Sequence, residues 1–407
     1  MEPALLIPVL RGILLSAIII LVGVPPTLKA AVYPLAGTHK LSTARADRAA
    51  LMLISISLFA IVVAVSGLTY LKAPEALSLS MSAIGTFLGT DQGLAWLTEI
   101  AIVPIVGGVT ILRFPRHSRT SQREWLTAVT LGGLFILAIV SWQGHSTAIE
   151  SEIIAIVVKF VHMTGAALWT GGLVVLAIIA PRVLEEVSEE ATEASGDGTP
   201  NEIVAATPVA IGMIRRFSIV AVAGVTLATA SGFVITAWHV RSAGSLTSTL
   251  YGLGLLAKVA LVLVAAGLGG FTRAIVVRRL SHDEESEQST VARMIWCLPL
   301  LQSHDPAENG VVPVFVRAVR LELIVLVSVI FLSVFLTASL SPPVDSNDQT
   351  VEIEAPMQIG EGTIGTWLIH HGGSFTFFIE LTALGIALAG ILAVSYELLR
   401  SHSSELI

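Results

Sequence analysis

The chain contains little charge. Of its 407 residues, 13% are charged and 54% are hydrophobic, whereas soluble domains carry about 25% charged residues. This shortage excludes an ordinary soluble domain and predicts a membrane protein with the lipid bilayer as its main partner. The net charge of -7 also argues against a nucleic-acid partner, because nucleic-acid-binding domains are usually basic.

Cysteine is almost absent from the sequence. The single cysteine, Cys297, excludes a disulfide framework and a cysteine-rich metal site. Nucleotide-binding motifs are missing too, since the sequence contains neither a P-loop nor a phosphorylated-aspartate motif. We therefore expect a protein that is not an enzyme and that draws no energy from ATP.

Long apolar runs are what the chain has in abundance. Each is near or above the ~20 residues that cross about 30 Å of hydrocarbon, and none alternates in polarity as barrel strands do. The predicted fold class is therefore all-α, a polytopic transmembrane helix bundle. Pro25, Pro26 and Lys29 replace the cleavage site of a signal peptide, so the first run is expected to be a helix. The predicted spans are residues 10–33, 49–71, 94–112, 125–143, 153–180, 217–239, 250–272, 318–340 and 374–398.

Basic residues favour one side of the membrane. Most lysines and arginines outside the spans lie in the 34–48, 113–123, 182–216 and 273–320 segments, whereas the alternate segments hold Arg11, Lys72 and Arg241. By the positive-inside rule, the N-terminus is outside and the C-terminus is cytoplasmic. The acidic 181–214 segment is then a cytoplasmic loop that we expect to be disordered in part. The outer 341–370 segment alternates in polarity at residues 350–354, which is compatible with a short strand.

A histidine lies inside the fifth apolar segment. It begins the run His162-Met163-Thr164-Gly165-Ala166-Ala167-Leu168-Trp169-Thr170-Gly171-Gly172-Leu173. Ionisable residues at membrane depth are costly and usually functional, and His162 is expected ~15 Å from the outer end of its helix. Small residues let helices approach closely, so a packing face is expected at Gly165, Trp169, Gly171 and Gly172.

Other histidines are expected above His162. With the predicted orientation, His145, His239, His370 and His371 fall at the outer surface. Imidazole together with the thioether of Met163 suits copper, and thioether favours Cu(I). The structural alternative is an interfacial polar residue at a helix end, or for His162 a buried histidine bonded to a neighbouring helix.

Further ionisable residues are expected at membrane depth. Lys258, Glu99 and Glu380 fall inside predicted spans. A pair of Lys258 with Glu380 or with Glu99 would neutralise buried charge, and the functional alternative is an ion or proton route beside His162. Glu322 lies near the predicted cytoplasmic end, where we expect a local pair with Arg317 or Arg320.

Four stretches of the chain, in order, resemble the copper resistance protein D family, the CopD/YcnJ-type copper transport membrane proteins. The stretches are Gly144-His145-Ser146 with the His162 run, Arg216-Phe217-Ser218 with Ser231-Gly232, Tyr251-Gly252 with Leu256-Ala257-Lys258 and Arg273, and Arg320-Leu321-Glu322 with Ser341-Pro342-Pro343. The resemblance covers residues 10–343. It implies an eight-helix core that moves copper across the cytoplasmic membrane, commonly as uptake, with a CopC-like copper-binding protein as a partner. Residues 1–343 then form the core, 344–373 an outer loop, and 374–407 an added ninth helix with a short tail.

The His162 run also resembles the membrane-type protoporphyrinogen oxidases. A redox protein that binds haem b through a bundle histidine is therefore the competing hypothesis. Two axial histidines must face each other at one depth, and the sequence predicts one deep histidine. The leading hypothesis is copper uptake, with copper captured by the outer histidines and passed to His162 and Met163. Neutral imidazole is the ligating form, so uptake is expected to weaken at acidic pH.

Overall fold

The computed structural model describes the backbone of residues 3–39, 43–72, 81–113, 119–143, 152–195, 202–240, 243–279, 311–339 and 375–404. These residues form helices and contain no strand, which confirms the all-α class. The expected strand at 350–354 lies outside them, as do His145, His370 and His371. The longer elements are α1 (Pro3–Thr27), α3 (Ala44–Lys72), α5 (Asp91–Arg113), α6 (Arg119–Gln143), α7 (Glu152–Val174), α8 (Ala180–Ser195), α9 (Glu202–His239), α11 (Leu250–Arg279), α13 (Val311–Ser339) and α15 (Phe375–Ser404).

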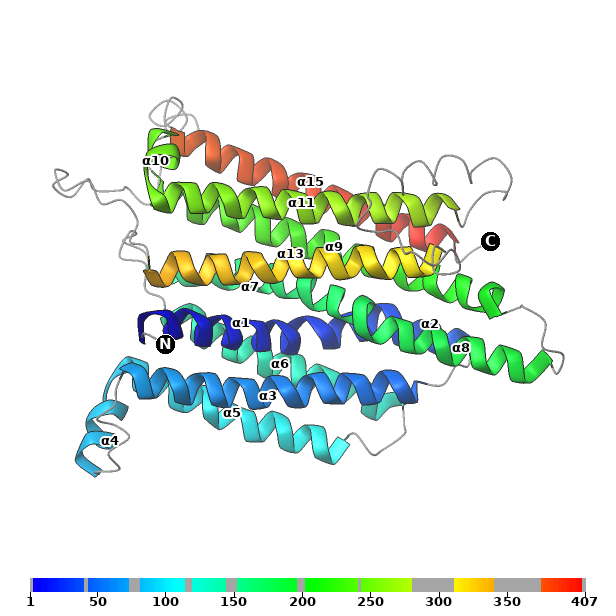
Figure 1. The fold of residues 1–407 in the computed structure, drawn as a ribbon, viewed down its shortest axis with the longest axis horizontal. Helices are drawn as coiled ribbons and strands as arrows, with labels where there is room; N and C mark the ends of the chain where they lie inside the picture. Colours follow the sequence, from blue (N-terminus) through cyan, green and yellow to red (C-terminus); the bar gives the residue numbers. More distant parts are fainter. Residues whose placement is uncertain are drawn as a thin grey trace, which may run out of the picture.

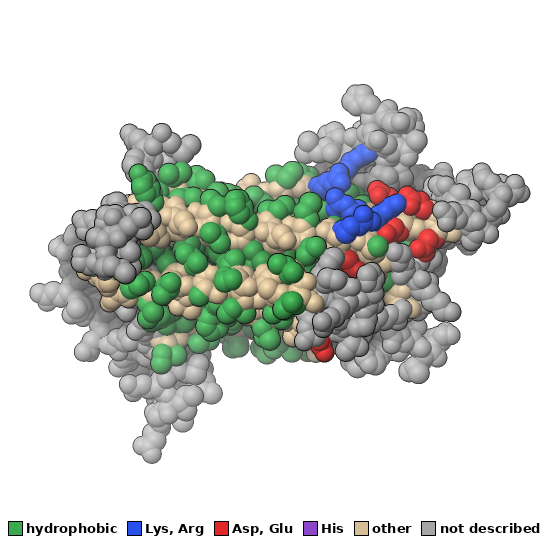
Figure 2. Space-filling model, turned by 90° about the horizontal axis from the view of Figure 1, so that it is seen from below, with side chains coloured by type: hydrophobic (Ala, Val, Ile, Leu, Met, Phe, Trp, Pro, Cys, Tyr) green, Lys and Arg blue, Asp and Glu red, His purple; other side chains and the backbone are tan. Residues whose placement is uncertain are grey.

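The nine predicted spans are confirmed. Within the described ranges, nine helical stretches are long and apolar enough to cross a membrane. Figure 1 shows these helices side by side along the long axis of the molecule, with the start of α1 and the end of α15 at opposite ends of the bundle, as an odd number of spans requires. Figure 2 shows a face that is largely apolar, with lysine, arginine and acidic side chains gathered near one end. The chain is a multi-pass membrane protein, and which end faces the cytoplasm stays a prediction.

Helix α7 lies at the centre of the packing. It packs most extensively on α9 and α1, and it also contacts α6 and α13. Helix α11 packs mainly on α13, and α15 packs on α9. Helices α3 and α5 lie at the edge of the bundle opposite α11 and α15 (Figure 1). The helix that carries His162 is thus covered on several sides by protein.

Glycines set the spacing of the central helices. A Cβ added to Gly171 on α7 would lie 2.7 Å from the Cα of Gly23 on α1. A Cβ added to Gly165 would lie 2.5 Å from the backbone nitrogen of Ala228 and 2.7 Å from the carbonyl oxygen of Gly224, both on α9. Contacts this short require glycine, because ordinary van der Waals contact begins near 3.4 Å. The backbones of α1, α7 and α9 therefore touch, as small residues allow between membrane helices.

The first span changes its helix type partway along its length. Its α-helix ends at Thr27 and continues as the wider turn η1 (Leu28–Val32) and then as α2 (Tyr33–His39). Pro25 and Pro26 have no N–H to donate, so the carbonyls one turn earlier lose their usual partners. One residue further on, the buried hydroxyl of Thr27 donates to the carbonyl of Gly23 at 2.8 Å. Extra turns of this kind are a common place for membrane helices to change direction.

The expected loop at 181–214 is helical in the residues that the structure describes, and partial disorder stays a prediction for residues 196–201, which lie outside them. Helix α7 continues through η3 (Val175–Ile179) into α8, and α9 already begins at Glu202. The acidic sequence is amphipathic in α8, where Val183 and Val187 are buried and Glu189 is exposed. Arg45, near the start of α3, binds Glu189 with Nη2 to Oε2 at 2.6 Å. The buried apolar stripe explains why a segment whose acidic composition suggested disorder is helical.

Candidate functional site: polar residues between α7, α9, α11 and α13

His162 lies on α7 against α9. Its Nδ1 is 2.7 Å from the carbonyl oxygen of Ala228 and 3.4 Å from the hydroxyl of Ser231. Gly232 leaves room for the ring, since a Cβ there would lie 3.1 Å from Cε1 of His162. The close approach of α7 to α9 at Gly165 and Gly224, about one turn away, brings the imidazole within reach of the α9 backbone.

The hydrogen bond to Ala228 fixes which ring nitrogen carries the proton. A carbonyl oxygen can only accept, so Nδ1 of His162 must donate. In a neutral imidazole, Nε2 then holds the lone pair that can bind a metal. Among the residues that the structure describes, Nε2 has no hydrogen-bond partner. A backbone carbonyl that orients a histidine through its other nitrogen is a usual feature of metal-binding histidines.

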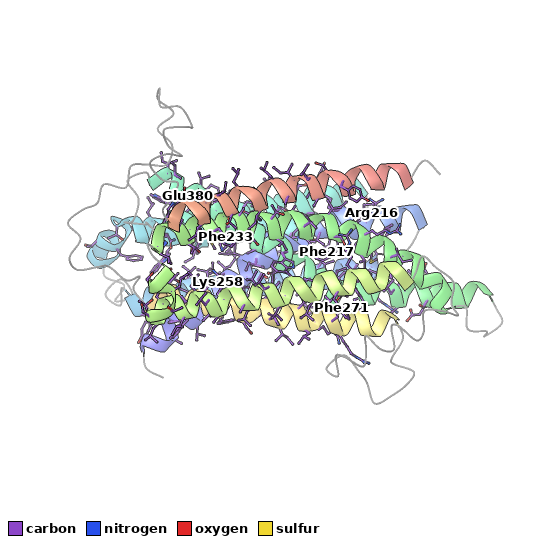
Figure 3. The ribbon with its side chains drawn as sticks, turned by 90° about the horizontal axis from the view of Figure 1, so that it is seen from above. Arg216, Phe217, Phe233, Lys258, Phe271 and Glu380 are labelled. Carbon is purple, nitrogen blue, oxygen red and sulfur yellow. The ribbon has the colours of Figure 1, made fainter. Side chains whose placement is uncertain are left out.

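Lys258 on α11 is the charged neighbour of His162. The two side chains are close enough for their charges to interact. Lys258 forms no ion pair with Glu380 or Glu99 in the described part of the chain. Figure 3 shows Glu380 on α15 and Lys258 on α11, with α9 between them. The predicted Lys258–Glu380 pair is therefore wrong, because α15 packs on α9 and not on α11.

Glu99 lies on the other side of the bundle. It is 0% exposed, and its Oε1 accepts a hydrogen bond from Nε2 of Gln143 on α6 at 2.6 Å. Its Oε2 is buried and lacks a hydrogen-bond partner within the described residues. The predicted Lys258–Glu99 pair is wrong, since α5 and α11 lie at opposite edges of the bundle in Figure 1. Lys159 on α7 also points to this side, where it donates to the carbonyl of Val140 at 3.3 Å.

Met163 leaves α7 in a different direction from His162. Its Sδ lies 4.0 Å from the hydroxyl of Ser141 on α6, whereas His162 contacts α9. Consecutive helical residues point about 100° apart, so the two side chains meet different neighbours. The thioether and the imidazole do not face one shared point in this arrangement.

His239 ends α9 beside the start of α11. Its Nδ1 is 2.8 Å from the carbonyl oxygen of Ile235, and its ring centroid is 6.4 Å from that of Tyr251. His239 lies three turns beyond Ala228 on α9, which is about 16 Å along the helix. His239 and His162 are therefore at different depths and cannot bind one ion together.

A buried carboxyl group on α13 contacts α7 deeper in the bundle than His162. Oε1 of Glu322 on α13 accepts a hydrogen bond from the indole nitrogen of Trp169 at 2.9 Å. Glu322 is 3% exposed and Trp169 4% exposed. The expected local pair of Glu322 with Arg317 or Arg320 is thus replaced by a contact between helices. The available signal was Trp169 itself, because a buried indole N–H usually finds an acceptor.

These polar residues repeat along single faces of their helices. On α7, His162 and Trp169 are about two turns apart and share a face. On α11, Tyr251, Lys258 and Gly269 follow a helical repeat of two and then three turns, so they also share a face. Along the length of the bundle, these residues meet at three successive depths. They are His239 with Tyr251, then His162 with Lys258, then Trp169 with Glu322 beside Gly269.

No complete metal site is assembled in the described residues. Within these ranges, no group of three or more histidine, cysteine, aspartate or glutamate side chains lies close enough to hold one ion. His162 can therefore supply one ligand, and a transported ion needs further donors from water or from moving side chains.

Fold and site together define a polytopic helical membrane protein that buries ionisable side chains between its spans. Residues 211–336 match the family model described as copper resistance protein D, and residues 1–154 match the copper resistance protein D-like N-terminal domain. The chain belongs to this CopD-type copper resistance family, as the sequence resemblance predicted, and it is a multi-pass protein of the cell membrane. The family matches end before α15, so the status of the ninth helix as an addition stays a prediction.

A curated relative points in the same direction. The chain is similar to the copper transport protein CutJ of Bacillus subtilis (strain 168), with 27% identity over 184 residues. The alignment covers 45% of this chain and 30% of that relative, so much of the relative has no counterpart in the comparison. No solved structure matches the chain.

Proposed function

We propose that this protein carries copper inward across the cell membrane and that His162 is the ligand inside the bundle. The observation that supports this most directly is the hydrogen bond from Nδ1 of His162 to the carbonyl of Ala228, which leaves Nε2 as the donor atom for a metal. Membership of a copper resistance family supplies the identity of the ion. It also favours transport over enzymatic catalysis.

The neighbourhood of His162 favours a soft ion. When Lys258 is protonated, its charge repels any cation that enters, and this repulsion is strong where water is scarce. Sodium or potassium ions, which bind by electrostatics alone, gain little from one imidazole to offset it. Copper(I) forms partly covalent bonds to imidazole, so it is the cation best able to bind beside Lys258.

The outer part of the proposed path consists of histidines at the predicted outer surface. His239 with Tyr251 forms its described part, and His145, His370 and His371 are expected to add ligands from outside the described ranges. A CopC-like copper-binding protein is the expected donor. An ion at His239 lies about 16 Å from the level of His162, so at least one intermediate position is needed. Met163 contributes to this path only if its side chain turns away from Ser141.

The haem-binding alternative has no described residue to complete it. Two histidines at one depth would be needed, and His239 lies three turns along α9 beyond Ala228, the residue that His162 contacts from α7. A visible Soret band from the purified protein would nevertheless favour that alternative over copper alone.

The test compares metal content in purified full-length protein loaded with Cu(I) under reducing conditions. We expect His162→Ala to lower the copper bound per chain and to lower copper entry into proteoliposomes, because it removes the donor nitrogen. His402→Ala, near the end of α15, is the matched control and should leave both unchanged. Unchanged copper content and transport in His162→Ala would contradict the proposal.

A further inference from the structure

The depth at which Trp169 meets Glu322 holds a carboxyl group to which the proposed transport function assigns no role. Glu322 lies about two turns inside the span that begins at Phe315, or roughly 10 Å from its end. It is on α13, its partner Trp169 is on α7, and Gly269 is on α11. Three helices therefore meet at one carboxylate.

One neutral hydrogen bond does not balance a buried negative charge. The indole of Trp169 donates a single N–H, whereas a carboxylate stripped of water requires a cation or several donors. Among the side chains that the structure describes, the basic residues on the helices packed against α13 are Arg11 on α1, Lys159 and His162 on α7, and Lys258 and Arg273 on α11, and α13 itself adds Arg317 and Arg320. None of them is among the groups that interact with Glu322, whose described partner is Trp169. The carboxyl group of Glu322 is therefore stable in two states, protonated and neutral, or ionised with a cation bound to it.

The position of Glu322 allows it to exchange a bound proton for a cation. Trp169 lies on the same face of α7 as His162 and about 10 Å further along the helix. Gly269 keeps the space beside the carboxyl open, since a Cβ there would lie 3.0 Å from Oε1 and 3.2 Å from Oε2. A cation that leaves His162 toward the predicted cytoplasmic end meets this carboxyl next in the described part of the chain.

We propose that Glu322 is the proton-exchange site of the copper path, held in place by Trp169. When a copper ion arrives, the O–H bond of the carboxyl breaks, the proton leaves to water at the predicted cytoplasmic end, and a copper–oxygen bond forms. When the ion departs to the cytoplasmic side, the carboxylate takes up one proton from water on the outer side, so each copper ion that enters releases one proton at the cytoplasmic end, and the oxidation state of copper does not change. This inference rests on the proposed transport function.

The test uses full-length protein in vesicles that contain a trapped pH-sensitive dye. Glu322→Gln keeps an oxygen that accepts from Trp169 but holds no exchangeable carboxyl proton. We expect it to bind copper at His162 with unchanged stoichiometry, to lose the copper-dependent dye signal, and to slow copper entry by about tenfold or more, or about 1.4 kcal/mol in the barrier. Glu189→Gln, an exposed carboxyl on α8, is the matched control and should retain entry and signal.

A second variant protects the test against misfolding. Gly269→Ala should slow copper entry by pressing on the carboxyl, whereas Gly267→Ala on the same helix meets no atom within 4 Å and should not. Wild-type entry in Glu322→Gln, or equal entry in the two alanine variants, would overturn the inference while the transport function stands. A wild-type protein that carries no copper would overturn both.

Discussion

The contact between α7 and α9 at Gly165 gives a prediction whose size follows from the geometry. In Gly165→Ala, the new Cβ would lie 2.5 Å from the nitrogen of Ala228 and 2.7 Å from the oxygen of Gly224. Both atoms belong to a helix backbone and cannot turn away, so the two helices must separate by roughly 1 Å to reach ordinary contact. The same movement lengthens the hydrogen bond from His162 to Ala228 from 2.7 Å to about 3.7 Å, which breaks it.

The change in the free energy of unfolding that Gly165→Ala causes has three parts. Overpacking of this kind costs about 1–3 kcal/mol, and a lost hydrogen bond in a membrane protein about 0.6 kcal/mol. Alanine returns up to about 1 kcal/mol through its better helix propensity. We therefore expect Gly165→Ala to lower the free energy of unfolding by about 1–3 kcal/mol and to lower copper content, because Nε2 of His162 is no longer oriented.

Unfolding in mixed micelles titrated with sodium dodecyl sulfate, followed by circular dichroism, measures the stability, and elemental analysis measures copper. Gly267→Ala makes the same chemical change in open space and should keep wild-type copper content. If Gly165→Ala matches Gly267→Ala in both measurements, the close approach of α7 and α9 does not hold His162 in place.

Three further outcomes follow from the packing and the orientation. Gly23→Leu should prevent α1 from packing, because any Cβ at Gly23 overlaps the backbone of Ala167, and a normal monodisperse peak in size-exclusion chromatography would contradict this. Arg45→Ala should leave stability almost unchanged, since its ion pair with Glu189 is exposed, and a large loss in the same detergent titration would show that this pair orders α8. Cys297 should react with a membrane-impermeant maleimide in inverted vesicles and not in right-side-out vesicles, and the reverse pattern would reverse the predicted orientation.

The sequence by itself determined the nine spans and the family. Span length and apolarity are properties of consecutive residues, so they can be read without knowing which helices are neighbours. The family motifs are local in the same way. Helix α8 could also have been predicted from the sequence, from the helical spacing of Val183 and Val187, but its acidic composition suggested disorder instead.

Only the tertiary structure decided which polar groups meet. Glu322 was expected beside arginines of its own helix and instead accepts from Trp169, and Glu99 was expected beside Lys258 and instead binds Gln143. Met163 follows His162 in the chain but contacts a different helix. These partners lie on helices far apart in the sequence, and the backbone contacts at Gly23, Gly165, Gly171 and Gly224 decide which helices become neighbours. A helical pattern fixes the face on which a residue lies, but not the helix that covers that face.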